Sequence, residues 1–250
     1  MGLFIFIIGT LFGSFYLVVA TRLPNNEDIL ISRSHCDNCG HILSWYELIP
    51  IFSYLFLKGK CKSCHKPISI MCPMIEIITG LLFLAMYLLF GISYEFYAGL
   101  IISSLLVIIF ISDFLYLIIL DSPLIISGIA IFILKYIYFG LNASLKALLS
   151  GVILFLFMYL LKLFGDYVFK RESLGGGDIK FSFIIGLVLG VKLGFIAIVL
   201  SSFLALPVSI AALIKTKNNE VPYGPFLVGS LFMVFVFMPK FTNLVLLLFP

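Results

Sequence analysis

Long apolar runs, separated by short polar segments, dominate the chain from its first residues onward. A bilayer core requires about 20 consecutive apolar residues for each helix that crosses it. Runs of this kind predict eight membrane-spanning helices, at about 2–20, 74–90, 96–112, 122–139, 146–165, 179–196, 198–214 and 225–249. The sixth and seventh are the weakest of these, because lysines and glycines interrupt them.

The composition agrees with this pattern. Of 250 residues, 62% are hydrophobic and only 11% are charged, and the mean hydropathy is +1.22. A soluble domain of this length cannot bury so much apolar surface, so the chain is predicted to be an all-α polytopic membrane protein whose partner is the lipid bilayer. The formal net charge of +4 gives no reason to expect a nucleic-acid partner.

The placement of basic residues predicts the orientation. No basic residue precedes the first span, and TRLP follows it without a cleavage pattern, so we expect an uncleaved anchor rather than a secretory signal. Lys and Arg gather in alternate loops, at Arg22, Arg33, Lys58, Lys60, Lys62, Lys66, Lys170, Arg171, Lys215 and Lys217. The loops near 91–95 and 140–145 contain neither residue. The positive-inside rule therefore predicts that both termini lie outside and that the basic loops face the cytoplasm.

The organisation expected along the chain is a first helix (1–20), a cytoplasmic loop (21–73) and a multi-span domain (74–250). The loop contains two C-x-x-C pairs, separated by 21 residues and formed by Cys36, Cys39, Cys61 and Cys64. Four thiolates at this spacing suit a tetrahedral, structural zinc ion, which leaves no open coordination position. A redox pair or free thiols are the alternatives. We expect His35, His41 and His65 to lie outside the metal site, and Cys72 to be a buried small residue.

Two of the acidic residues in or beside the spans have few polar neighbours in sequence. Asp113 ends the apolar run SSLLVIIFIS, and Asp178 follows the glycine run 175–177. The glycines permit positive φ angles and the close approach of another backbone. The predicted topology places both aspartates at one membrane face, where two carboxylates could share a proton and hydrolyse a peptide bond. A proton or cation site of a transporter remains the alternative from these residues.

Motifs along nearly the whole chain resemble those of the type IV prepilin peptidases, which are membrane aspartic proteases of the GxGD type. The similar segments are GSF at 13–15 with Arg22 and Pro24, SRSHCDNCG at 32–40, LSWYELIPIFSYL at 43–55, GKCKSCHKPIS at 59–69, PMIEIITG at 73–80, Asp113 with Asp121, LGGGDIKF at 174–181 and VPYGPFLVG at 221–229. GGGDIK resembles the family's G-x-G-D-x-K signature, with Gly175, Gly177, Asp178 and Lys180 in the matching places.

This resemblance implies an enzyme of the bacterial inner membrane that removes the basic leader of prepilins or pseudopilins at the cytoplasmic face. It implies Asp113 and Asp178 as the catalytic pair, with Gly175, Gly177 and Lys180 in the active-site loop. Members with the cysteine loop commonly also N-methylate the new N-terminus with S-adenosylmethionine. Pilus assembly, protein secretion and competence are all compatible settings.

Two positions depart from the family pattern. Leu120 stands where proline usually precedes the second aspartate, and Cys72 stands where an aromatic residue is common. A non-catalytic assembly factor that docks through the cysteine loop is a further alternative. A shortened pilin would distinguish a peptidase from both alternatives.

Overall fold

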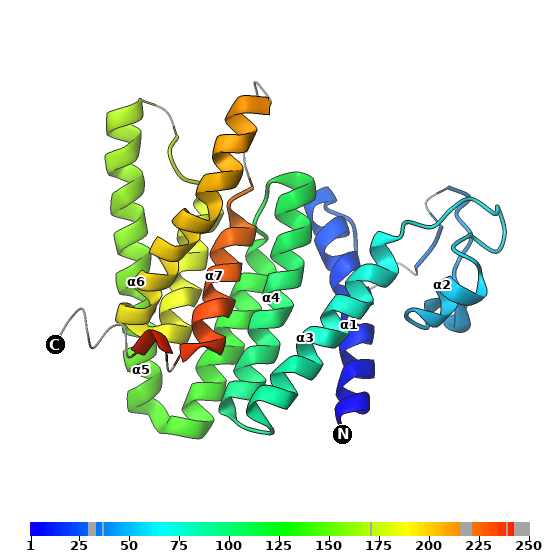
Figure 1. The fold of residues 1–250 in the computed structure, drawn as a ribbon, viewed down its shortest axis with the longest axis horizontal. Coiled ribbons are helices and arrows are strands. Elements are labelled where there is room, and N and C mark those ends of the chain that lie inside the picture. Colours follow the sequence, from blue (N-terminus) through cyan, green and yellow to red (C-terminus); the bar gives the residue numbers. More distant parts are fainter. Residues whose placement is uncertain (30–33, 37, 171, 216–221, 239, 243–250) are drawn as a thin grey trace. The chain divides into compact units, whose positions relative to one another are not determined.

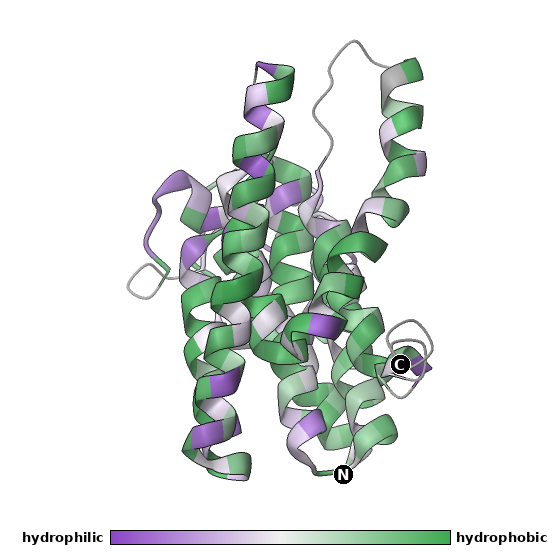
Figure 2. Cartoon of the chain, turned by 90° about the vertical axis from the view of Figure 1, so that its left-hand side faces the viewer, coloured by the Kyte–Doolittle hydropathy of each residue, from purple (hydrophilic) through white to green (hydrophobic). Residues whose placement is uncertain are grey.

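The structure is a computed structural model that describes residues 1–250 except 30–33, 37, 171, 216–221, 239 and 243–250 (Figure 1). Within the described residues the regular structure is helical, apart from two isolated β-bridges in the 21–73 loop. In the part of the chain that the structure describes, five helices are long and apolar enough to cross a membrane, and a shorter apolar helix follows them. Figure 2 shows hydrophobic residues along most of the length of these helices. The predicted all-α polytopic membrane fold is confirmed.

The chain forms two compact units, Met1–Ile92 and Ser93–Pro250. The elements of the first unit are α1 (Gly2–Arg22), η1 (Leu23–Asn25), η2 (Trp45–Leu48), α2 (Phe52–Phe56) and α3 (Met71–Phe90). Those of the second are α4 (Tyr94–Tyr116), α5 (Asp121–Phe169), α6 (Gly176–Lys215) and α7 (Gly224–Val236). The sequence-based division into a first helix (1–20), a loop (21–73) and a multi-span domain (74–250) stays a prediction.

In the first unit, α1 and α3 cross at unusually short range. A Cβ atom added to Gly9 would lie 2.8 Å from the Cα of Gly80, and one added to Gly13 would lie 2.9 Å from the Cα of Glu76. Glycines four residues apart let two helix backbones approach, which compensates for the weak driving force between helices in lipid. The glycine of the GSF segment therefore has a packing role.

In the second unit, α5 and α6 each contain one glycine with a non-helical backbone. Gly140 has φ 78° and ψ 177°, and Gly190 has φ 78° and ψ −178°. Glycine adopts positive φ without steric cost, so it permits a sharp change of direction inside an otherwise continuous helix. Each of these helices consequently has two limbs (Figure 1). Lys135, on the first limb of α5, donates a 3.1 Å hydrogen bond to the Val188 carbonyl, two residues before the break in α6.

The limbs of α5 flank the first limb of α6 on two sides. A Cβ atom at Gly128 would lie 3.1 Å from Ile184, and one at Gly151 would lie 2.9 Å from Phe183. Ser182 Oγ also donates to the Leu154 carbonyl at 3.3 Å. The start of α6, which contains Asp178, is therefore held between two helical limbs that are far from it in sequence.

Several predicted boundaries were wrong. The sixth and seventh predicted spans meet at Gly190 rather than near 197, because the break depends on the positive φ of one glycine and not on a polar segment. The predicted outer loop 140–145 is a break at Gly140 alone. α7 ends at Val236, and residues 239 and 243–249 of the predicted span 225–249 lie outside the described part of the chain, as do Arg33, Arg171 and Lys217. The count of eight spans stays a prediction.

Candidate active site and metal centre

Asp113 is a buried carboxylate at the end of α4. Its residue exposure is 5%, and it lies one turn before the last residue of the helix. The carboxylate Oδ2 accepts a 2.8 Å hydrogen bond from the backbone N–H of Gly224, the first residue of α7. The first N–H groups of a helix lack partners within the helix and carry the positive end of its dipole. The N-terminus of α7 is thus a built-in partner for Asp113.

Asp178 lies in the first turn of α6, with 9% of its surface exposed. The backbone N–H of Gly175 forms a hydrogen bond with its carboxylate. A Cβ atom at Gly175 would lie 3.0 Å from Asp178 Oδ2, and one at Gly177 would lie 2.7 Å from the Cβ of Ile119. The tight contact at Gly177 is with the side chain of Ile119, between α4 and α5, and that at Gly175 is with the carboxylate of Asp178 itself, so neither is the expected approach of another backbone. None of the three glycines adopts a positive φ.

The structure brings Asp113 and Asp178 together, although 65 positions separate them in sequence. The two carboxylates are close enough to interact electrostatically. Buried carboxylates at such range do not both ionise easily, so they tend to share one proton. The neutral group can donate a hydrogen bond to a carbonyl oxygen, while the charged group can accept a proton from water. These are the two abilities that an aspartic protease requires.

Asp121 and Lys180 form an ion pair beside this site. Lys180 Nζ lies 2.8 and 2.7 Å from the two carboxylate oxygens of Asp121, and both side chains are more than half exposed. The pair ties the first residue of α5 to the first limb of α6, at one end of an apolar groove of about 710 Å³ between these helices. It thereby holds the Asp121 end of the 117–120 connection, which includes Ile119, against α6. Asp121 thus differs from Asp113 in being exposed and bound to a lysine.

The four predicted cysteine ligands form one cluster. Their Sγ atoms all lie within 4.8 Å of one another, and the Cys36–Cys64 and Cys39–Cys61 pairs are each 3.9 Å apart. A tetrahedral zinc ion with Zn–S bonds of about 2.3 Å requires sulfur atoms about 3.8 Å apart. The cluster therefore fits a tetrahedral metal ion. None of the four forms a disulfide.

The two C-x-x-C pairs share one backbone design. The N–H of Gly40 donates to the Cys36 carbonyl at 2.8 Å, and the N–H of His65 donates to the Cys61 carbonyl at 2.9 Å. Gly40 and His65 both adopt positive φ, 69° and 56°. Each pair is therefore a tight turn that directs two thiols to one point, as expected of a zinc knuckle.

Backbone amides also prepare one of the thiols for metal binding. N–H groups of Cys64 and Ser63 form hydrogen bonds with the Cys61 sulfur and lower the pKa of this thiol to about 7. Metals bind the thiolate rather than the thiol. Cys72 lies outside the cluster and is half-buried rather than buried as predicted.

The histidines near the cysteines lie outside the cluster, as predicted. His41 Nε2 lies 3.3 Å from Oε2 of the buried Glu47. The same carboxylate accepts a 2.8 Å hydrogen bond from the Ser44 N–H. The Ser44 hydrogen bond and then His41 hold the pKa of the Glu47 carboxyl below its usual range, although burial acts in the opposite direction. His41 therefore belongs to the fold of the loop.

Glu76 connects three parts of the first unit. It is buried on α3, and its Oε2 accepts a 2.7 Å hydrogen bond from the Ile51 N–H. The Ser14 side chain of α1 also forms a hydrogen bond with it. Glu76 therefore joins α1, α3 and the 21–73 loop.

Two residues of these sites were missed from sequence. Gly224 was quoted only as part of VPYGPFLVG, although a glycine followed by proline is a signal for a helix start. Ile51 gave no signal, because its φ of 65° is rare for a β-branched residue. Both act through backbone N–H groups, which residue type does not reveal.

Comparison with known proteins accounts for this combination of features. Residues 7–90 match the bacterial peptidase A24 N-terminal domain, and residues 100–210 match the type IV leader peptidase family. A "Prepilin leader peptidase/N-methyltransferase" of Bacillus subtilis is 34% identical over 241 residues, which cover 93% of each chain. The chain belongs to the type IV leader peptidase family. It is therefore an enzyme, an aspartic peptidase.

Other relatives in this family carry the same name. The protein of Vibrio cholerae is 31% identical over 244 residues, which cover 92% of this chain and 94% of that protein. The protein of Myxococcus xanthus is 39% identical over 178 residues, but these cover 70% of this chain and only 52% of that protein. No solved structure matches the chain.

Proposed function

We propose that this enzyme removes the basic leader of type IV prepilins or pseudopilins at the cytoplasmic face of the bacterial inner membrane, with Asp113 and Asp178 as its catalytic pair. The observation that carries the proposal is the meeting of these two buried carboxylates at the ends of α4 and α6. The names of the relatives support the substrate class. The basic residues of the adjoining loops support the cytoplasmic orientation.

The reaction is hydrolysis by an activated water molecule. The ionised aspartate accepts a proton from water, whose oxygen attacks the carbonyl carbon of the scissile bond, while the neutral aspartate protonates the carbonyl oxygen. The C–N bond of the tetrahedral intermediate then breaks: the leaving amine takes the proton gained by the first aspartate, and a hydroxyl proton of the intermediate returns to the second aspartate, which restores the pair. The Gly224 N–H orients Asp113 throughout, and the tight packing at Gly175 and Gly177 orients Asp178.

We further propose that Cys36, Cys39, Cys61 and Cys64 hold one structural zinc ion. Four thiolates fill its coordination shell, so the metal contributes to folding rather than to peptide hydrolysis. The names of the relatives also support N-methylation of the new N-terminus, for which S-adenosylmethionine is the expected methyl donor. When bound, this donor would supply a methyl group carried on a sulfonium sulfur, which the deprotonated amine would accept with release of a neutral thioether and loss of one proton. None of the described residues is assigned to the methyl donor.

Co-expression with one prepilin tests the peptidase function. The mass of the recovered pilin should fall by that of the leader, and a further methyl group should add about 14 Da if the second activity is present. The enzyme with Asp113→Asn provides the control for cleavage by other proteases. An unchanged pilin mass with properly inserted wild-type enzyme would contradict the proposed function.

A further inference from the structure

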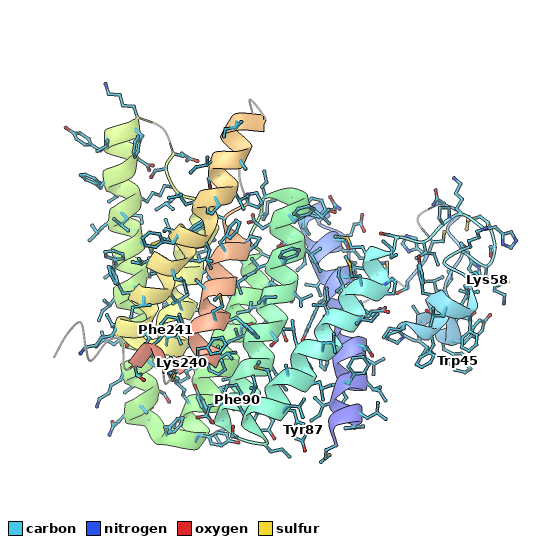
Figure 3. All side chains as sticks on the ribbon, viewed as in Figure 1. Trp45, Lys58, Tyr87, Phe90, Lys240 and Phe241 are labelled. Carbon is cyan, nitrogen blue, oxygen red and sulfur yellow. The ribbon has the colours of Figure 1, made fainter. Side chains whose placement is uncertain are left out.

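The 21–73 loop exposes an unusual set of large apolar side chains. We define the aromatic patch as Trp45 of η2 with Phe52, Leu55 and Phe56 of α2, whose exposures are 78%, 60%, 65% and 83%. Positions 52, 55 and 56 share one face of α2 because they are three and four residues apart. η2 packs against α2, and Figure 3 shows Trp45 beside that helix. Exposed apolar patches of this kind mark surfaces that are covered by something else.

A hydrogen bond fixes the position along the axis of α3 at which α2 begins. The N–H of Ile51, the residue before α2, donates to Glu76 at 2.7 Å. At 1.5 Å per residue, Glu76 lies about 7.5 Å along the helix axis from Met71. The membrane-spanning helix α3 is already apolar above that level, where Ile70 and Met74 are 71% and 50% exposed. α2 therefore begins beside the second turn of α3, within the length of α3 that is apolar enough to cross a membrane.

The backbone at Ile51 sets the direction in which α2 leaves this anchor. Ile51 has φ 65° and ψ −52°, and the Phe52 N–H donates to the Pro50 carbonyl at 2.6 Å. These values describe a γ-turn of the rare positive-φ type. A β-branched residue adopts it only where surrounding contacts hold it there, and the buried Glu76 carboxylate is such a contact. The aromatic patch is thus presented by a fixed turn.

The charges around the patch complement an anionic surface. Four exposed lysines follow α2 or lie on the second knuckle, at Lys58, Lys60, Lys62 and Lys66. Between Ser34 and Ile70 the described acidic residue is Glu47, which is buried and paired with His41. Lys62 donates to the Tyr46 hydroxyl and lies 5.0 Å from its ring centroid, so an aromatic and a basic side chain are already joined beside the patch. Aromatic residues combined with lysines are typical of surfaces that bind the headgroup region of anionic membranes.

We propose that the 21–73 loop lies on the bilayer, with the aromatic patch inserted among the headgroups of the adjacent leaflet and the exposed lysines in contact with anionic phospholipids. This surface lies outside the catalytic pair, and its role does not depend on the proposed peptidase mechanism. The position of Glu76 along α3 and the excess of lysine favour lipid over a protein occupant, because both place the patch against the membrane.

The chain contains a built-in probe for this surface, because Trp45 is its only tryptophan. The full-length metal-bound protein would be reconstituted into vesicles of phosphatidylcholine and phosphatidylglycerol. Trp45 emission should be blue-shifted relative to tryptophan in water. Phosphatidylcholine brominated on its acyl chains should quench it, whereas aqueous iodide should not. A water-like emission maximum with quenching by iodide alone would overturn the proposal.

Variants test the two halves of the surface. Lys58→Gln and Lys60→Gln should each lower about fivefold the ratio of protein whose aromatic patch is inserted among the headgroups to protein whose patch is exposed to water. High salt should have a similar effect. Leu55→Ser should weaken quenching by brominated lipid. Ile42→Ser is the matched control, because Ile42 is 52% exposed on the same loop but outside the patch. Every variant is compared at wild-type metal content, so that loss of the fold is not mistaken for loss of binding.

Other occupants predict different results. A second copy of the chain would make the blue shift depend on protein density in the vesicle rather than on lipid charge. A prepilin partner would leave Trp45 quenched by iodide until prepilin is added. Either outcome would overturn membrane binding by this surface.

Discussion

The backbone N–H of Gly224 and the carboxylate of Asp113 are joined by a 2.8 Å hydrogen bond across 111 positions of sequence. A Cβ atom at Gly224 would lie 2.9 Å from Asp113 Oδ2 and 3.0 Å from Ile109 Cγ2. The residue at the start of α7 must therefore be small for Asp113 to keep both its position and its hydrogen bond. This relationship leads to the first test of the active site.

Gly224→Ala should lower prepilin cleavage without removing the protein from the membrane. The added methyl group has to displace the Asp113 carboxylate or α7, and a misplacement of about 1 Å at a catalytic group can cost about 10²-fold in rate. Gly229→Ala is the matched control on the same helix, because a Cβ atom there meets nothing within 4 Å. Cleavage rates in membranes that contain equal amounts of each variant would measure the effect. Equal rates for the two variants would contradict the role of Gly224.

The catalytic pair predicts the largest losses. Asp113→Asn or Asp178→Asn should each abolish detectable cleavage, because each removes either the acid or the base, and such groups contribute about 10² to 10⁴-fold. Both proteins should still insert in the membrane, since asparagine is similar in size to aspartate. The pilin mass after co-expression would report the result. Near-normal processing by either variant would exclude the pair.

The ion pair beside the site predicts a smaller effect. Asp121→Asn and Lys180→Gln should each reduce cleavage only slightly, because an exposed pair contributes about 0–1 kcal/mol. The double variant should be no worse than the sum of the single variants, since both remove the same interaction. A loss with Asp121→Asn as large as that with Asp113→Asn would show that the catalytic aspartate of this motif has been wrongly assigned.

The glycines before Asp178 predict opposite outcomes at neighbouring positions. Gly177→Val should sharply reduce cleavage, because its Cβ atom would lie 2.7 Å from the Cβ of Ile119. Gly176→Ala should be tolerated, because a Cβ atom there meets nothing within 4 Å. Prepilin processing and membrane content would be measured for both. If Gly177→Val processed prepilin normally, the run would serve only as a linker.

The cysteine cluster predicts one zinc ion per chain by elemental analysis of the purified protein. Cys36→Ser or Cys64→Ser should lower the zinc content and make the 21–73 loop sensitive to proteases, because metal binding and folding are coupled in such small units. Cys72→Ser is the control and should leave the zinc content unchanged, since Cys72 lies outside the cluster.

Brief chelation separates a structural metal from a catalytic one. Cleavage by the folded enzyme should continue at first and then decline as the loop unfolds. An immediate and reversible loss would require a catalytic metal. Metal-free protein with a protease-resistant loop would instead favour a redox role for the cysteines.

The sequence predicted the parts of the site that depend on side-chain type. Four thiols at knuckle spacing, an aspartate at the end of an apolar run and another after a glycine run are visible without a structure. The backbone partners, Gly224 and Ile51, were not visible, because every residue except proline has a backbone N–H group. Gly224 and Ile51 serve as the donors because they lie where α7 and α2 begin.

Some helix boundaries were predicted wrongly from sequence for a related reason. Hydropathy detects where polar segments enter an apolar run, and near Gly190 the charged interruption is the single residue Lys192. The change of direction there depends on a φ angle of 78°. Glycine permits this angle, but a glycine in the sequence does not show that the angle is adopted. The predicted boundary was therefore displaced toward Ser201 and Ser202, where the composition changes.

The division between Ile92 and Ser93 has a consequence for the order of events during synthesis. By the time a ribosome has translated residue 92, it has made α1, α3, all four clustered cysteines, Ile51 and Glu76. Everything that the metal centre and its anchor require is then present in the nascent chain. Asp113 and Asp178 have not yet been translated. The cysteine cluster can therefore be complete before either aspartate of the proposed catalytic pair exists, so the newborn chain can form its 21–73 loop while it still lacks the groups proposed to cut a substrate.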